Sequence, residues 1–334
     1  MVKLSDIGEF GLIKRFSRQF LQDIPGKYTG IGDDCAVIPV NEKEVLLVTT
    51  DMLIEGSHFI RNKISAFDLG QKSLMVNVSD IAAMGGTPRS AYLSIGLTTE
   101  TDVKWIDDFF KGIRHVCQEY NMFLLGGDTT RSHDRLVINF AVIGAGIPQK
   151  IKRRSSAVPG DIICINDYVG DSGGGLQVLL NDLPQDKDSK YLIKRHNVPR
   201  ANIREGKWLS GWKEVHAMMD VSDGIESDIH RIMESSEVGA EIDLDKVPLS
   251  EELLRTAKNY KWNAHELGVI GGEDYCLMVT ISEKNPDKII KEYEKEFKKP
   301  LYKIGRITES KGELIFRYAG KLTGLAKHGW DHFK

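Results

Sequence analysis

The chain has 334 residues, of which 41% are hydrophobic and 28% charged, and its formal net charge is −3. This length predicts about two domains, each with a sizeable core, and the composition is typical of a globular protein. A weak negative charge gives no general attraction to nucleic acid or to an anionic membrane, so a bound anion needs a local site. We therefore expect neither nucleic acid nor a membrane as a partner.

The cysteines are too far apart in the sequence for a zinc site or a redox dithiol. They are Cys35, Cys117, Cys164 and Cys276. We expect them to be reduced thiols in a cytoplasmic protein. The first residues, MVKLSDIGEF, lack the apolar core of a signal peptide. No later run approaches the roughly 18 apolar residues that a membrane helix needs.

The first part of the chain alternates helical and strand patterns. The run 45–48 consists of four apolar β-favouring residues and predicts a strand buried on both faces. Ser65 is an N-cap candidate for the helix that follows, in which Asp80 would lie mid-helix. The expected helices are 6–22, 65–84 and 105–120, and the expected strands are 45–48, 91–97, 123–125 and 136–146.

Residues 147–161, with two prolines and four basic residues, are the best linker candidate. We therefore predict domains at 1–148 and 149–334. The second domain should contain strands at 161–167, 215–220, 239–244 and 271–280, and helices at 223–234, 250–258 and 284–298. Because both halves mix helices and strands, the sequence predicts an α+β fold of two mixed α/β domains.

Aspartates recur after apolar runs and beside glycines. Asp51 follows the strand predicted at 45–48, so we expect it at a strand end, where open α/β sheets place ligands. Each aspartate alone is more often a turn or capping residue. Together they predict a magnesium site for a polyphosphate, because carboxylates bind magnesium and cations must separate approaching phosphates. The others are Asp34, Asp80, Asp128, Asp220 and Asp223.

Two neighbouring features leave alternatives open. Asp33 and Asp34 would point to opposite faces of a strand, so we expect only one of them to bind metal. In the basic linker, Arg153 and Arg154 could be a solvated surface or could reach a phosphate, which suits a planar guanidinium.

Glycine-rich motifs exclude several classes of nucleotide-binding protein. The sequence has no G-x-x-x-x-G-K-[ST] and no complete G-x-G-x-x-G motif, which disfavours a P-loop kinase and a standard dinucleotide-binding domain. The segment 170–174 (GDSGG) has the letters of a trypsin-like nucleophile motif, but it precedes a helical pattern in a chain without a disulfide framework. A glycine-rich loop before a helix suits either a bound anion or close backbone packing.

Six motifs in the same order resemble the thiamine-monophosphate kinase family, of the aminoimidazole-ribonucleotide-synthetase-like superfamily. The motifs are GIGDDCA (30–36), TTD with GSHF (49–51 and 56–59), NVSDIAAMG (77–85), GGDTT (126–130), DVSDG (220–224) and GGEDY (271–275). The resemblance extends from residues 8–10 to residues 329–333. The segment GDSGGG departs from the family pattern, in which small alanines follow the serine, and this puts the flexibility of that loop in doubt.

The resemblance implies ATP-dependent phosphorylation of thiamine monophosphate to thiamine diphosphate, with several magnesium ions. It also implies a homodimer whose N-terminal sheets pair into a barrel. By the family pattern, magnesium would be bound by Asp34, Thr49, Thr50, Asp51, Asp80, Asp128, Asp220 and Asp223. ATP would contact Gly126, Gly127, Arg154 and Ser222, and the thiamine substrate would contact His58, Glu273 and Trp330.

The chemistry needs no general base, because the attacking atom is an oxygen of an already ionised phosphate. Trp330 could stack on a cationic ring and Glu273 could pair with a positive or amino-bearing one. Trp330 could equally be a packing residue near the C-terminus.

Three other functions compete with this interpretation. A selenophosphate or purine-pathway synthetase of the same superfamily is the nearest, although selenium chemistry would want a reactive cysteine and Cys35 has no neighbouring lysine. A nucleotide-binding sensor without turnover would need fewer metal ligands. A nucleic-acid-binding protein would depend on the basic stretch 187–207, and the net charge of −3 argues against it.

Overall fold

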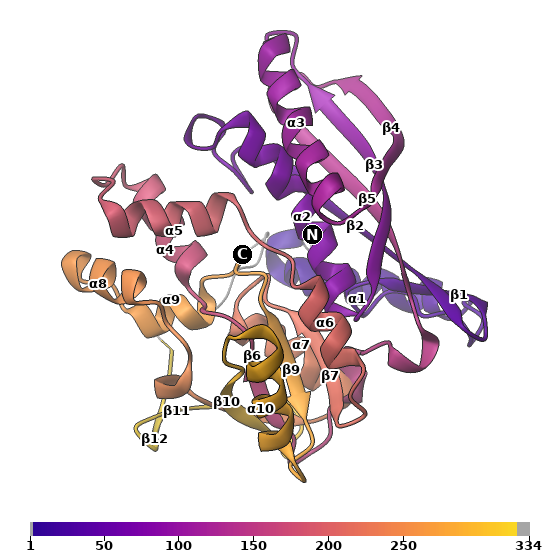
Figure 1. Cartoon of the computed structure of the whole chain (residues 1–334), viewed down its shortest axis with the longest axis vertical. Helices are drawn as coiled ribbons and strands as arrows, with labels where there is room; N and C mark the ends of the chain where they lie inside the picture. The colour runs from indigo at the N-terminus through magenta and orange to yellow at the C-terminus, as the bar shows by residue number, and fades with distance from the viewer. Residues whose placement is uncertain (1–2, 326–334) are drawn as a thin grey trace.

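The computed structural model describes residues 3–325 as two mixed α/β units, each built around its own sheet (Figure 1). The first sheet has the strand order β1-β2-β5-β3-β4. Its strands are β1 (Ala36–Asn41), β2 (Glu44–Ile54), β3 (Thr87–Leu97), β4 (Phe123–Arg131) and β5 (Val137–Gly146). The helices of this part are α1 (Leu4–Leu21), α2 (Ala66–Ala83) and α3 (Val103–Glu119).

The second sheet has the order β12-β11-β8-β10-β6-β9-β7. Its strands are β6 (Ile162–Ile165), β7 (Val215–Asp220), β8 (Gly239–Asp243), β9 (Leu277–Ile281), β10 (Tyr302–Thr308), β11 (Leu314–Tyr318) and β12 (Lys321–Thr323). The helices are α4 (Asp171–Leu180), α5 (Lys187–Asn197), α6 (Ile203–Ser210), α7 (Ile225–Ser236), α8 (Glu251–Tyr260), α9 (Ala264–Ile270) and α10 (Pro286–Phe297). Short 3-10 turns are η1 (Arg61–Lys63), η2 (Pro148–Lys150), η3 (Arg154–Ser156) and η4 (Leu244–Lys246).

Strand β2 corrects the prediction made for Asp51. The strand does not end at residue 48, because Asp51 and the three residues after it pair with Phe140 to Val137 of β5. It is also not buried on both faces, since Val45, Leu47 and Thr49 are buried while their neighbours are partly exposed. Asp51 therefore lies within a strand, on the same face as Thr49.

Strand β4 is longer than the predicted run 123–125. It continues through the GGDTT motif to Arg131 and pairs in parallel with β3. All nine of its residues are exposed, because β4 is an edge strand with no helix over it. In the second domain, the strand expected at 271–280 begins only at Leu277. Helices α5, α6 and α9 and strands β10 to β12 were not predicted.

Helix α2 is the central helix of the first domain. Ser65 is its N-cap, as predicted, and its side chain accepts a hydrogen bond from the backbone N–H of Asp68. Asp80 lies in the last turn and not mid-helix. The helix packs closely on α3 at two glycines: a Cβ on Gly70 would lie 2.1 Å from the carbonyl oxygen of Phe109, and one on Gly112 would lie 2.0 Å from that of Phe67.

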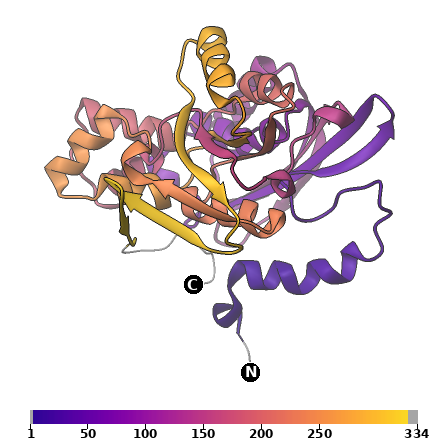
Figure 2. The ribbon, with the colours of Figure 1, turned by 90° about the horizontal axis from the view of Figure 1, so that it is seen from below.

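Among residues 3–325, no helix lies over the other face of the first sheet. Large apolar side chains on that face and on the edge strand are exposed, including Met52, Tyr92, Phe123 and Leu125. Helix α1, kinked at Gly8, lies at the periphery and likewise exposes Phe16 and Phe20 (Figure 2). Contiguous apolar surface of this kind is typical of an interface. No helix within residues 3–325 is long and apolar enough to span a membrane.

The glycine crossing of α2 and α3 gives a test of the packing. We expect Gly112→Ala to lower the free energy of unfolding by about 1–3 kcal/mol, because the added methyl group must push the two helices apart. Urea denaturation followed by circular dichroism measures the change. Gly26→Ala is the matched control, because a Cβ there meets no atom within 4 Å. An equal loss in both variants would contradict the packing argument.

Candidate metal and phosphate site

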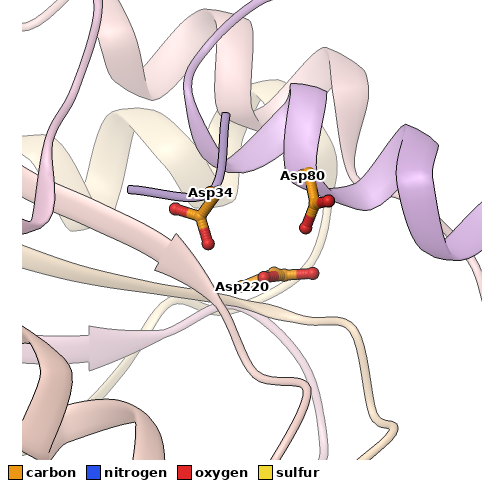
Figure 3. Close-up of side chains that lie close together, drawn as sticks. All are labelled: Asp34, Asp80 and Asp220. Carbon is orange, nitrogen blue, oxygen red and sulfur yellow. The ribbon is translucent and has the colours of Figure 1, made fainter. Parts of the chain in front are cut away.

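Three carboxylates from distant parts of the sequence converge between the two domains (Figure 3). Asp34 lies in the segment before β1, Asp80 in the last turn of α2, and Asp220 at the end of β7. One oxygen of each lies within 4.8 Å of the others. Because Asp220 belongs to the second sheet, the site exists only when both domains are in place.

Asp51 and Asp223 extend this group. Asp51 lies close enough to Asp80 for its charge to raise the pKa of the Asp80 carboxyl group. The backbone N–H of Asp51 donates to Asn77 Oδ1 at 3.1 Å, which fixes β2 against α2 at this point. Asp223 follows β7 in the loop before α7 and forms an ion pair with Arg231. The structure thus brings Asp34, Asp80 and Asp220 together, with Asp51 and Asp223 near enough to interact electrostatically, and metal binding by these aspartates stays a prediction.

Burial and mutual repulsion perturb the acids. Burial, with the neighbouring charges of Asp223 and Asp34, raises the pKa of Asp51 to about 6. Burial and the charge of Asp34 raise the pKa of Asp220 to about 7, and burial with the charge of Asp51 raises the pKa of Asp80 well above its usual value. The short polar contacts from Thr49 to Asp80 and from Ser79 to Asp220 stabilise the ionised forms only in part.

Asp33 and Asp34 have different surroundings. Asp33 accepts a hydrogen bond from the backbone N–H of Arg154 and lies near the side chain of Arg153. Asp34 Oδ1 pairs with the guanidinium of Arg154 at 2.5 Å. Asp34 Oδ2 is buried without a hydrogen-bond partner. Of the two neighbouring acids, Asp34 is the one that faces the converging carboxylates.

The donor set fits a hard divalent cation. An unpartnered buried carboxylate oxygen is costly, and at Asp34 that oxygen belongs to a group whose other members are also oxygen donors. Magnesium and calcium prefer such ligands, and no histidine or thiolate that would favour zinc belongs to this group among the described residues. The arrangement can therefore hold one or more magnesium ions facing a phosphate chain.

The GGDTT motif of β4 lies elsewhere in the protomer. Asp128 pairs in register with Ser94 and Gly126 with Tyr92, and both β3 partners are on the sheet face that no helix covers. Asp128 is therefore on the face opposite α2, outside the converging group. Thr49 and Thr50 have different partners. The Thr49 hydroxyl contacts Asp80, whereas Thr50 accepts a hydrogen bond from Asn139. Metal binding by Asp128 and Thr50, and ATP binding by Gly126 and Gly127, stay predictions.

Two of the three residues expected to bind the organic substrate, Glu273 and His58, are described by the structure. Glu273 lies next to the DVSDG loop, because its backbone N–H donates a hydrogen bond to the carbonyl oxygen of Ser222 at 2.7 Å. His58 lies near enough to influence the Glu273 carboxylate electrostatically. Trp330 lies outside the described residues.

Sequence reasoning missed two residues at this place, Lys72 of α2 and His196 of α5. Both lie within 3.3 Å of Glu273 Oε2. The signal available for Lys72 was a single basic residue within the helix predicted at 65–84.

Two family descriptions match the chain over most of its length. Residues 32–145 match the AIR synthase related protein, N-terminal domain, and residues 159–317 match the corresponding C-terminal domain. The thiamine-monophosphate kinase of Haemophilus influenzae is 36% identical, with 98% of each chain covered. The chain belongs to the thiamine-monophosphate kinase family. The Escherichia coli K12 member of this family is also 36% identical, again with 98% of each chain covered.

Solved structures of the family share the fold. A structure described as AaThiL complexed with AMPPCP and TMP has a TM-score of 0.86 and 32% identity, with 99% of each chain covered. The thiamine monophosphate kinase of Aquifex aeolicus has a TM-score of 0.80 and 31% identity, with coverage of 96% of this chain and 99% of that one. The expectation of two domains of this superfamily is thereby confirmed.

Because the pKa values of the buried aspartates are raised, we expect the metal-free folded protein to become less stable as the pH rises. Because the pKa of Asp220 is about 7 in the folded protein and near 4 when unfolded, the folded state binds this proton more tightly. Without metal, the free energy of unfolding should fall by roughly 2 kcal/mol relative to Asp220→Asn as pH rises from about 5 to 8. Chemical denaturation of wild type and variant in chelator measures it.

Magnesium should reverse this loss, because a cation that binds the ionised carboxylates stabilises the folded state. The increase in melting temperature on adding millimolar magnesium should be larger at pH 8 than at pH 5 in the wild type, and should shrink in Asp220→Asn. A wild-type protein whose metal-free stability rises over this pH range relative to the variant would contradict the electrostatic account.

Proposed function

We propose that the protein catalyses the ATP-dependent phosphorylation of thiamine monophosphate to thiamine diphosphate. The convergence of Asp34, Asp80 and Asp220 supports this proposal most strongly, because it supplies a place for divalent cations between two phosphate-bearing ligands. Family membership supports the choice of substrate. The related structure described with AMPPCP and TMP has one ligand of each expected kind.

In this proposal the metal ligands are the eight residues of the family pattern. Asp34, Thr49, Asp51, Asp80, Asp220 and Asp223 belong to the region of the converging carboxylates, whereas Thr50 and Asp128 lie on the opposite face of the first sheet. Magnesium, when bound, would neutralise the charge that develops on the transferring phosphoryl group. Gly126, Gly127, Arg154 and Ser222 would contact ATP. His58, Glu273 and Trp330 would contact the thiamine substrate.

The chain itself would bind, orient and desolvate the two ligands. The acceptor oxygen belongs to a phosphate that is already ionised at neutral pH, so direct in-line transfer needs no side chain to remove a proton. Asn77 and Ser79 would keep Asp51 and Asp220 in place. Positioning and charge neutralisation are then the whole contribution of the protein.

The direct test is incubation with ATP, magnesium and thiamine monophosphate, with thiamine diphosphate measured by chromatography. Formation of thiamine diphosphate with stoichiometric ADP supports the proposal. ATP consumption only with a selenium or purine-pathway substrate would favour another superfamily member. ATP binding without turnover on any of them would favour a sensor.

Asp51→Asn should lower turnover by about a hundredfold or more, because it removes one charge from the cation site. Its metal-free fold should be at least as stable as the wild type, since the repulsion on Asp80 decreases. Steady-state kinetics at saturating magnesium and thermal melts measure both. Asp33→Asn is the control, because its carboxylate faces the Arg154 backbone. Wild-type kcat in Asp51→Asn would exclude the proposed site.

We also propose a homodimer in which the uncovered sheet faces of two N-terminal domains pair, with the domain boundary between residues 148 and 149. Met52, Tyr92 and Leu125 support the dimer, because burying their apolar surface is favourable and β4 is an edge strand that needs cover. The absence of sheet pairing between β5 and β6 supports the boundary.

Leu125→Lys should convert the dimer to monomer at micromolar concentration, because a charge would be buried in the interface. Sedimentation velocity measures the change. Leu125 is 63% exposed in the protomer, and Val103→Lys, at a site 70% exposed on α3, is the matched control and should stay dimeric. A dimer that survives Leu125→Lys would place the interface elsewhere.

A further inference from the structure

Lys72 is a buried cation in the middle of α2. Its side chain has no exposed surface, and its ammonium lies 3.2 Å from Glu273 Oε2. Burying a lysine is strongly unfavourable unless an acid is paired with it. The pair joins the helix of the first domain that carries Asp80 to the loop of the second domain that carries Glu273.

The Glu273 backbone is held in a strained conformation. Its φ is +56°, a value rare for residues other than glycine, and its N–H donates to the Ser222 carbonyl at 2.7 Å. At the preceding Gly272, a Cβ would lie 2.8 Å from the same carbonyl oxygen. Strain of this kind persists where the surrounding structure fixes a functional side chain.

The GDSGGG segment supports the same loop from the other side. Asp274 accepts hydrogen bonds from the backbone N–H groups of Gly170, at 2.6 Å, and Ser172, at 3.2 Å. A carboxylate of the chain itself therefore occupies the N-terminus of α4. A Cβ on Gly170 would lie 2.7 Å from the backbone nitrogen of Gly268, so the glycines serve close packing and not anion binding.

The charged groups that face Glu273 are Lys72 of α2, His196 of α5 and His58 after β2. His196 Nδ1 lies 3.3 Å from Glu273 Oε2 and 3.0 Å from Ser172 Oγ. Burial and the charge of Lys72 lower the pKa of His196 to about 4, so it is neutral near pH 7. Burial raises the pKa of Glu273, but the charge of and hydrogen bond from Lys72, together with His196 and His58, outweigh burial and lower this pKa. Lys72 is thus the main cation that keeps Glu273 ionised.

We propose that Lys72 is a positioning residue that fixes the Glu273 carboxylate, ionised and correctly oriented, for the amino-bearing or cationic ring of the organic substrate. The inference rests on the proposed function and extends it to a residue outside the six family motifs. The Glu273 side chain remains 27% exposed, which leaves part of the carboxylate accessible to a ligand. Lys72 itself is enclosed and would act only through Glu273.

The experiment compares Lys72→Met, Glu273→Gln and the double variant. Lys72→Met keeps length and apolar stem but removes the cation. We expect it to raise KM for thiamine monophosphate about tenfold, the usual effect of losing one charge-assisted hydrogen bond. Both kcat and KM for ATP should stay within about twofold. In the Glu273→Gln background, Lys72→Met should add nothing, because its effect passes through Glu273.

Lys111→Met is the matched control, since Lys111 forms an exposed ion pair with Asp108 on α3, and it should leave all constants unchanged. Equal losses toward both substrates, additive effects of the two substitutions, or an unchanged KM would overturn the proposal. Should Lys72→Met fail to fold, Lys72→Gln is measured in the same way.

Calorimetric binding of thiamine monophosphate in the presence of AMPPCP separates the two proposals. If the wild type binds thiamine monophosphate but does not phosphorylate it, the proposed function fails, and the Kd values of the same variants decide the role of Lys72. If the wild type binds no thiamine monophosphate, both proposals fail.

Discussion

Repulsion among buried carboxylates is the constraint around which this structure is arranged. Two unit charges about 4 Å apart repel by about 4 kcal/mol even at an effective dielectric constant of 20, and Asp34, Asp80 and Asp220 bring three carboxylates closer than 4.8 Å. Without cations, burial and this repulsion favour the protonated carboxyl groups, and the pKa of Asp220 rises to about 7. When cations are present, the same concentration of negative charge attracts divalent metal, and the bound metal in turn attracts phosphate. An arrangement that is unfavourable for the empty protein is therefore suited to a phosphotransferase.

Helix α2 connects the group of carboxylates to parts of both domains. Its last turn carries Asp80, Asn77 on the same face holds β2 through the Asp51 N–H, and its buried middle presents Lys72 to Glu273 of the second domain. The glycine crossing with α3 fixes the helix position from the other side. The candidate metal site and the proposed substrate contact thus share one rigid element. A shift of α2 would disturb both, which is why a preorganised site needs such close helix packing.

The two glycine-rich segments illustrate how one sequence signal can have two physical causes. In GGDTT, Gly127 has a φ of +151° and a Cβ there would lie 1.7 Å from the carbonyl oxygen of Leu93, so strand pairing requires glycine. In GDSGGG, Gly170 allows the close approach of α9, and Asp274 satisfies the helix N-terminus. Both segments looked like candidates for phosphate contact, and the backbone packing accounts for these glycines without a ligand.

The sequence by itself determined the alternation of helices and strands, the family, and the set of acids, because apolar periodicity and short motifs are local properties. It located Ser65 as an N-cap and Asp220 at a strand end correctly. It failed to place Asp51 within a strand, since strand length depends on pairing with β5. It gave no indication of the sheet face on which Asp128 lies, since that depends on register with β3. The residues alone left Asp33 and Asp34 open, the family pattern favoured Asp34, and the structure shows that Asp34 belongs to the converging group. Only the tertiary structure brought Lys72 and His196 to Glu273. Those contacts join residues about 80 to 200 positions apart, and no local pattern encodes which distant side chains meet.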